Sequence, residues 1–155
     1  MRRLLTVLLA MVAAIGIAGC GDDSAKQRNA YADAVNRAQS DFAQSFKSLS
    51  RRITSTTTAG QGRRTLQGFE DAVDDVVADL RAIDAPTDVQ PLHRRLITEV
   101  ADYGREIRRA KRAFATGAPR RILDAQSKLV SATTQISTRI NRTIAAINRQ
   151  LQKQS

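Results

Sequence analysis

Hydrophobic residues recur at intervals of three and four along four segments of the chain, with polar residues between them. This spacing predicts amphipathic α-helices, because it places the apolar side chains on one face of a helix with 3.6 residues per turn. The four segments cover about residues 24–53, 63–83, 88–115 and 119–151. None alternates apolar and polar residues as a half-buried strand does. The pattern therefore predicts an all-α protein.

The residues between the segments favour short connections. Residues 54–62 are rich in Ser, Thr and Gly and predict the first turn, while Pro86 ends the second segment because the residue before a proline avoids helical geometry. Residues 87–90 read as a capping box, and Gly117 and Pro119 predict the end of one helix and the start of the next. We therefore expect an up-down-up-down antiparallel four-helix bundle. The spacing also fits coiled-coil seams, which leaves pairing with a second copy open.

The pattern of the first residues predicts an export signal. Arg2 and Arg3 precede a run from Leu4 to Ile17 that is apolar except for Thr6 and Gly16. Fourteen helical residues span about 21 Å, which is short of the roughly 30 Å hydrocarbon core of a membrane. A signal-peptide helix before the bundle is therefore expected, rather than a permanent membrane span.

The run ends in Ile17-Ala18-Gly19-Cys20, which resembles the lipobox of bacterial lipoproteins. The resemblance implies that a lipoprotein signal peptidase recognises Ile17, Ala18 and Gly19 and cleaves before Cys20, whose thiol carries a diacylglyceryl group. Membrane lipid is then a partner through a covalent anchor. The predicted divisions are a signal peptide at 1–19, a lipidated cysteine with a short tether at 20–23, and a bundle at 24–155. The expected location is the outer face of the cell membrane, or the periplasmic side of a membrane in a two-membrane cell.

The mature region is similar to small helical lipoproteins of GC-rich bacteria, and the likeness implies no activity. It rests on two groups of residues: Tyr31, Asn36 and Phe42, and Leu80, Pro86, His93 and Tyr103.

Candidate chemistry is scarce in the mature chain. Cys20 is the only cysteine, so lipidation leaves no thiol for catalysis and no disulfide. His93 is the only histidine and lies beside apolar residues, which favours a structural role at the edge of the bundle. A di-metal bundle site needs Glu-x-x-His pairs, and Glu70, Glu99 and Glu106 all stand at other distances from His93. We predict no catalytic residue, no metal site, no cofactor and no enzymatic activity.

Positive charge gathers in two windows that the bundle brings to one end. The chain carries a formal net charge of +10. Residues 47–64 and 105–121 hold twelve Lys and Arg against Glu106 alone, and both windows lie at the end opposite Cys20. We call the candidate binding residues among them the distal basic pole: Arg51, Arg52, Arg63, Arg64, Arg108, Arg109, Lys111, Arg112, Arg120 and Arg121.

Two interpretations of this pole remain open. Six of its cations lie near the ends of predicted helices, where they complement the helix dipole, but Arg63, Arg64, Arg120 and Arg121 lie near the starts, where the dipole disfavours them. This favours a surface that docks on an anionic envelope polymer or an acidic protein. Export argues against nucleic acid, and the codon bias of a GC-rich genome explains the arginines without any function.

The sequence favours a non-enzymatic, membrane-anchored interaction module. The alternative is a helical carrier or receptor that binds a small apolar ligand between its helices. A purely structural role in an envelope complex belongs to the same class as the first hypothesis, and the oligomeric state is undetermined.

Overall fold

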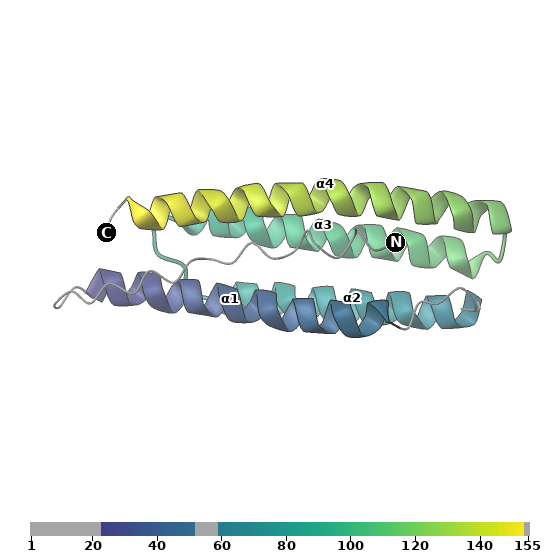
Figure 1. Cartoon of the computed structure of the whole chain (residues 1–155), viewed down its shortest axis with the longest axis horizontal. Helices are drawn as coiled ribbons and strands as arrows, with labels where there is room; N and C mark the ends of the chain where they lie inside the picture. The colour runs from purple at the N-terminus through teal and green to yellow at the C-terminus, as the bar shows by residue number, and fades with distance from the viewer. Residues whose placement is uncertain (1–22, 52–58, 154–155) are drawn as a thin grey trace.

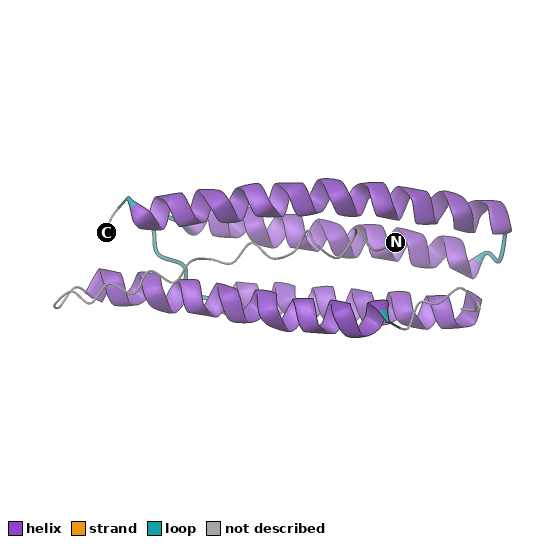
Figure 2. Cartoon of the chain, in the orientation of Figure 1, coloured by secondary structure: helices purple, strands orange, loops and turns teal. Residues whose placement is uncertain are grey.

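A computed structural model describes residues 23–51 and 59–153 of the chain (Figure 1). Four helices follow one another: α1 spans Asp23–Ser50, α2 Ala59–Ala82, α3 Gln90–Ala115 and α4 Pro119–Gln152. They pack against one another, and the described residues contain no strand (Figure 2). The predicted all-α class is therefore confirmed for this part of the chain.

The helices lie side by side along the length of the molecule (Figure 1). The beginning of α1 and the connection from α2 to α3 lie at one end, which we call the proximal end. The beginning of α2 and the connection from α3 to α4 lie at the opposite end, which we call the distal end. Each helix therefore lies beside the next one in the chain.

Packing between the helices is uneven. Helix α3 packs extensively on both α2 and α4, whereas α1 packs mainly on α2. Within the described ranges, the backbone of α1 makes few close approaches to α3 or α4. Helix α1 is therefore the element with the least support from the rest of the fold.

The core is formed by the apolar positions that recur at three and four residues. Burial of these aliphatic and aromatic side chains supplies the main stabilisation of the fold. On α1 and α2 the buried side chains include Tyr31, Val35, Ala38, Leu66, Phe69, Val73, Val76, Val77 and Leu80. On α3 and α4 they include Leu96, Val100, Ile107, Ala110, Ile136, Ile144, Ile147 and Leu151.

The start of α2 differs from the prediction. We expected residues 54–62 to form a turn, but the helix already begins at Ala59 and includes Gly60 to Gly62. A Cβ atom on Gly62 would lie 3.1 Å from Cε1 of Phe114, so glycine lets α2 approach the end of α3 closely. This tertiary contact extends the helix through two residues of low helix propensity. Residues 52–58, which include most of the expected turn, lie outside the described residues.

The ends of α3 confirm one expected signal and overturn another. No capping box forms at residues 87–90: the N-cap residue is Val89, and there is no side-chain capping hydrogen bond. Instead, the buried Val89 donates its N–H to the carbonyl of Pro86 at 3.0 Å and accepts from the N–H of His93 at 2.8 Å. At the other end Gly117 has a φ of +65°, which favours glycine, and Pro119 begins α4 as predicted.

Candidate binding surface at the distal end

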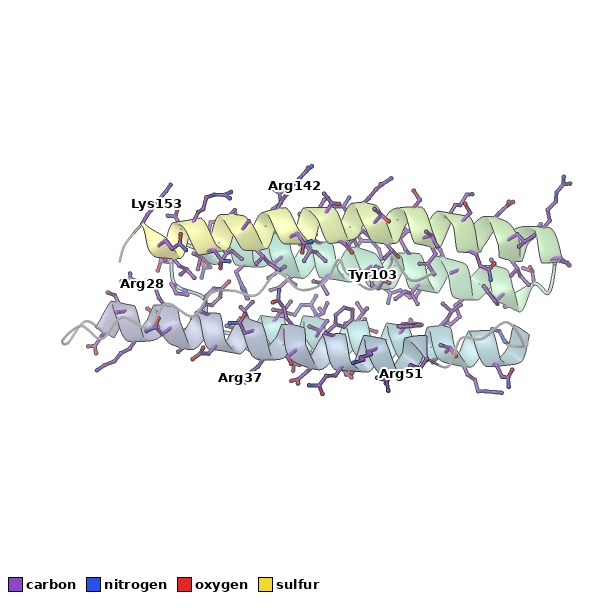
Figure 3. All side chains as sticks on the ribbon, viewed as in Figure 1. Arg28, Arg37, Arg51, Tyr103, Arg142 and Lys153 are labelled. Atoms are coloured by element: carbon purple, nitrogen blue, oxygen red, sulfur yellow. The ribbon has the colours of Figure 1, made fainter. Side chains whose placement is uncertain are left out.

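The fold brings most of the distal basic pole to one end of the molecule. Close packing of Gly62 on Phe114 places the beginning of α2 beside the end of α3, and three residues connect α3 to α4. The arginines of these three helix ends therefore share the distal end, whereas Arg51, which follows the last residue of α1, lies nearer the middle of the molecule (Figure 3). Arg52 lies outside the described residues, as do the predicted lipidation site Cys20 and the peptidase recognition residues Ile17, Ala18 and Gly19.

Two cations of the pole are engaged between α3 and α2. Nη1 of Arg108 lies 3.5 Å from Oε1 of Glu70 and 3.7 Å from Oδ1 of Asp74. Nζ of Lys111 forms an ion pair with the same Glu70 and donates to Oε1 of Gln67 at 2.6 Å. The side chain of Glu70 is only 12% exposed. These two cations neutralise a partly buried carboxylate, so they hold α3 on α2.

A third cation of the pole is paired within its own helix. Nη1 of Arg109 lies 2.5 Å from Oε1 of Glu106, three residues earlier. The neighbouring Arg105 pairs in the same way with Asp102, which also accepts from Nη2 of Arg139 on α4 at 2.9 Å. Of the five cations that the sequence places at residues 105–112, Arg105 and Arg109 are therefore neutralised within α3 itself.

The remaining cations of the pole face solvent. They are exposed, and none forms an ion pair with any described residue. We call this set the exposed arginine cluster: Arg51, Arg63, Arg64, Arg112, Arg120 and Arg121. The described part of the distal end thus carries a surface of guanidinium groups with open hydrogen-bonding capacity.

The sequence predicted that the helix dipole disfavours arginines at the starts of two helices, and the structure shows this placement at only one of them. Because α2 begins at Ala59, Arg63 and Arg64 lie beyond its first turn, where the dipole effect has decayed. Arg120 and Arg121 directly follow Pro119 in the first turn of α4, which has no acidic residue and no side-chain cap. The unfavourable placement is therefore restricted to the start of α4.

A buried polar cluster, which the sequence did not reveal, lies toward the proximal end. Nε2 of His93 lies 2.8 Å from the carbonyl oxygen of Leu80, and the hydroxyl of Tyr31 lies 3.2 Å from Nδ1. A carbonyl only accepts, so Nε2 carries the proton and Nδ1 accepts from Tyr31. The rings of Tyr31 and His93 also meet edge to face, with centroids 5.5 Å apart and an interplanar angle of 73°.

The surroundings of His93 and Tyr31 favour the neutral form of both side chains. Burial lowers the pKa of His93, against a smaller opposing effect of the Leu80 carbonyl. Burial raises the pKa of Tyr31, and the negative charge of Asp88 raises it further. His93 is 5% exposed, so the expected place at the edge of the bundle is wrong: the ring lies inside and joins α1, α2 and α3.

A second buried polar contact joins α3 to α4. Glu99 is buried, and its Oε2 accepts from the hydroxyl of Thr143 at 2.8 Å. Its Oε1 accepts from Nε of Arg95, one turn earlier, at 2.9 Å. The spacing of Arg95 and Glu99 is visible in the sequence, but the partner on α4 is not, since it lies 44 residues away.

A small apolar cavity lies among the four helices. Its volume is about 40 Å³, and its lining includes Phe42 of α1, Leu80 of α2, Val100 of α3 and Ile140 of α4. Tyr103 also lines it; burial raises the pKa of this tyrosine. A cavity that holds benzene measures about 150 Å³. This cavity is therefore smaller than one that holds benzene.

Two features are absent from the described residues, 23–51 and 59–153. No three His, Cys, Asp or Glu side chains there are grouped so that they could hold a metal ion. None of the four helices combines the length and the apolar character needed to cross a membrane.

No family model, curated protein or solved structure matches the chain.

Proposed function

We propose that this chain is an exported lipoprotein and a non-enzymatic interaction module. In this proposal residues 1–19 are a signal-peptide helix, Cys20 carries the lipid, and the rest is an up-down-up-down antiparallel bundle. The module is anchored on the outer face of a membrane. It docks through its distal end on an acidic partner, either a polymer of the envelope or a protein.

The observation that carries the proposal is the exposed arginine cluster. The fold neutralises Arg108, Arg109 and Lys111 with carboxylates, yet it leaves the arginines of α2, the end of α3 and the start of α4 in solvent. A guanidinium group forms paired hydrogen bonds with carboxylate or phosphate, so such a surface suits an anionic partner.

The positions of the two ends support the same function. Cys20 precedes the start of α1 by three residues, so a lipid on Cys20 would hold the proximal end at the membrane. A helix of 28 residues is about 42 Å long. The arginines are thus presented away from the anchor, where a partner in the envelope is accessible.

The test is co-sedimentation of the protein, extracted from membranes in detergent, with purified cell-envelope fractions at rising salt concentration. We expect capture at low salt that weakens as salt rises, because exposed charges are screened within about 10 Å at 0.1 M salt. Changing Arg63, Arg64, Arg120 and Arg121 together to Glu is expected to abolish capture.

A control with the same change in net charge is available elsewhere on the molecule. Arg37, Arg142 and Lys153 point away from the helices into solvent (Figure 3), and Arg149 is also exposed. Changing these four residues to Glu should leave capture largely intact. Equal loss in both quadruple variants would mean that overall charge, and not the distal end, governs capture, and the proposed docking surface would be wrong.

A further inference from the structure

Two exposed arginines border the contact between α2 and α3. Arg63 comes seven residues before Glu70, so the two share a face of α2, and Glu70 forms an ion pair with Lys111 of α3. Arg112 comes four residues after Arg108, which contacts the same Glu70. Arg63 and Arg112 therefore lie on the sides of α2 and α3 that meet each other.

A third exposed arginine, Arg121, borders α3 from the other side. It precedes Arg139 by eighteen residues, which is about five helical turns, so both lie on one face of α4. Nη2 of Arg139 lies 2.9 Å from Oδ2 of Asp102 on α3. Arg121 is therefore on the side of α4 that meets α3.

The two remaining arginines of the distal end face outward. Arg64 stands nine residues, about two and a half turns, before the buried Val73, and therefore lies on the opposite side of α2. Arg120 stands about four and a half turns before the buried Ile136 and lies on the outer side of α4. From α2 across α3 to α4, the arginines thus form a series that we call the arginine belt: Arg64, Arg63, Arg112, Arg121 and Arg120.

The members of the belt point in different directions around the end of the molecule. Neighbouring helix axes lie 8–10 Å apart, so the path across the three helices is about 20 Å long. A rigid helix or a flat membrane contacts one side of such an end at a time, whereas a flexible chain bends around α3 and reaches every arginine. The belt segments, residues 59–64 and 112–121, contain no acidic residue, and Asp124 follows one turn after Arg120 without pairing to it. The geometry therefore suits a flexible polyanion.

The belt offers little to a protein partner. Protein interfaces bury an apolar or aromatic centre inside a polar rim. Between the arginines, the chain exposes Gln61, Thr116 and Gly117. The exposed Leu123 is two residues from Arg121 and so points about 200° away from it, toward the opposite side of α4.

The belt also lacks what nucleic acids use. Single-stranded nucleic acids stack their bases on exposed aromatic rings. The belt segments contain one aromatic residue, Phe114, which is half-buried and packs against Gly62. A polymer that binds here therefore gains from its charges and hydroxyl groups, and not from bases or apolar groups.

The donors of the belt match phosphate better than carboxylate. Each guanidinium group presents several N–H donors, and the first amides of a helix add donors that have no partner inside the helix. At the start of α4 these amides belong to Arg120 and Arg121, and no side chain caps them. The tetrahedral oxygens of phosphate accept from several directions at once, whereas one guanidinium fork occupies both oxygens of a carboxylate.

We propose that the partner is a flexible, hydrophilic polymer of phosphodiester-linked units that wraps the distal end along the arginine belt. This inference rests on the proposed function, since it names the class of partner for the same end of the molecule. It gives Arg112, in the middle of the belt, the same importance as the arginines on α2 and α4.

The first test measures binding of the full chain, in detergent, to synthetic glycerol phosphate oligomers, to polyglutamate and to oligothymidylate, each matched in charge. Affinity for the glycerol phosphate oligomers should rise with length until they span the belt, about 20 Å. An oligomer of that length should bind at least about tenfold more tightly than polyglutamate and no more weakly than oligothymidylate. Equal affinity for all lengths, or tighter binding of polyglutamate or oligothymidylate, would overturn the inference.

The second test compares two single substitutions of exposed arginines at helix ends. Arg112→Ala should weaken binding of the long oligomer by about tenfold. It should also lower the slope of log affinity against log salt by about 0.7, the contribution of one phosphate contact in a single-stranded chain. Arg51→Ala is the matched control, since Arg51 lies off the belt, nearer the middle of the molecule (Figure 3). Equal losses in both variants, with the fold intact by circular dichroism, would contradict the belt.

Lipid headgroups, which also carry phosphate, are tested with vesicles of anionic and of zwitterionic phospholipid. The lipid anchor would insert into both, so only the difference between them reports on the arginines. We expect Arg112→Ala to leave this difference unchanged. A preference for anionic vesicles that Arg112→Ala removes would assign the belt to the membrane and overturn the inference.

The two proposals fail in different ways. Unchanged capture after reversal of Arg63, Arg64, Arg120 and Arg121 contradicts the proposed docking function. Loss of capture on that reversal, without length-dependent binding of the glycerol phosphate oligomers, keeps the docking function and rejects the phosphodiester polymer.

Discussion

Protonation of His93 is expected to weaken the fold at mildly acidic pH. In the folded chain Nε2–H donates to the carbonyl of Leu80, and Nδ1 accepts from Tyr31. A second proton, on Nδ1, would remove the acceptor that Tyr31 uses and place a charge where the ring is 5% exposed. Because this contact joins three helices, its loss affects the free energy of unfolding of the whole molecule.

The direction of the effect follows from the lowered pKa of His93. Above pH 6.5 the histidine is neutral in both the folded and the unfolded chain, so its contribution to stability is fully present. Below pH 6.5 the unfolded chain binds a proton that the folded chain resists, and stability falls as pH decreases toward the folded pKa. The loss is largest if the folded ring stays neutral, and is then on the order of 1 kcal/mol at pH 5.5 and about 2 kcal/mol at pH 5.0.

Urea denaturation followed by circular dichroism between pH 8.0 and 5.0 measures this loss. The wild-type free energy of unfolding should decline from about pH 6.5 downward, while the variant His93→Gln should be nearly flat down to about pH 5.5, above the usual range of carboxyl groups. Tyr31→Phe keeps the aromatic contact but removes the hydroxyl, and should cost about 1–2 kcal/mol at pH 7.5. Identical slopes in wild type and His93→Gln would refute the reasoning, because the titrating group would then be another residue.

Two further substitutions test the packing of the helices by the same denaturation assay. A Cβ atom on Gly104 would lie 3.2 Å from Cγ1 of the fully buried Val73, so Gly104→Val should destabilise by about 1–3 kcal/mol, whereas Gly60→Ala, with nothing within 4 Å, should be neutral or slightly stabilising. Equal effects at the two glycines would contradict the close approach of α2 and α3. Thr143→Val keeps the shape of the side chain but leaves the buried Oε2 of Glu99 without its partner, which should cost about 1–3 kcal/mol; a loss below about 0.5 kcal/mol would indicate that water replaces the hydroxyl.

The sequence predicted the helical class and most helix bounds because the apolar spacing reflects burial directly. The fourth segment, expected at 119–151, matches α4 at Pro119–Gln152 almost residue for residue. Where the local sequence predicted one structure and tertiary contacts favoured another, the structure follows the contacts. Gly60 and Gly62 suggested a turn, yet packing on Phe114 makes that stretch helical.

The charged surface was predictable only in part. Counting charges located the distal end, but it could not separate Lys111, which neutralises Glu70 on another helix, from Arg112, which faces solvent one residue later. That separation depends on which face of α3 meets α2. The exposure of Leu123 and Val130 depends in the same way on the orientation of α4, since the neighbouring Ile122 and Leu129 are the half-buried residues.

The neighbour-by-neighbour packing of the helices also determines how the chain can acquire its structure. Helix α2 packs on α1, α3 on α2, and α4 on α3, so most contacts join residues that are close in the sequence. Proteins with such low contact order fold in microseconds to milliseconds, because little loop entropy is lost before each contact forms. A chain that emerged from a membrane pore with its N-terminus first could therefore add one helix to the preceding one as each became free. The last pair to form, α3 with α4, is the one that completes the distal end.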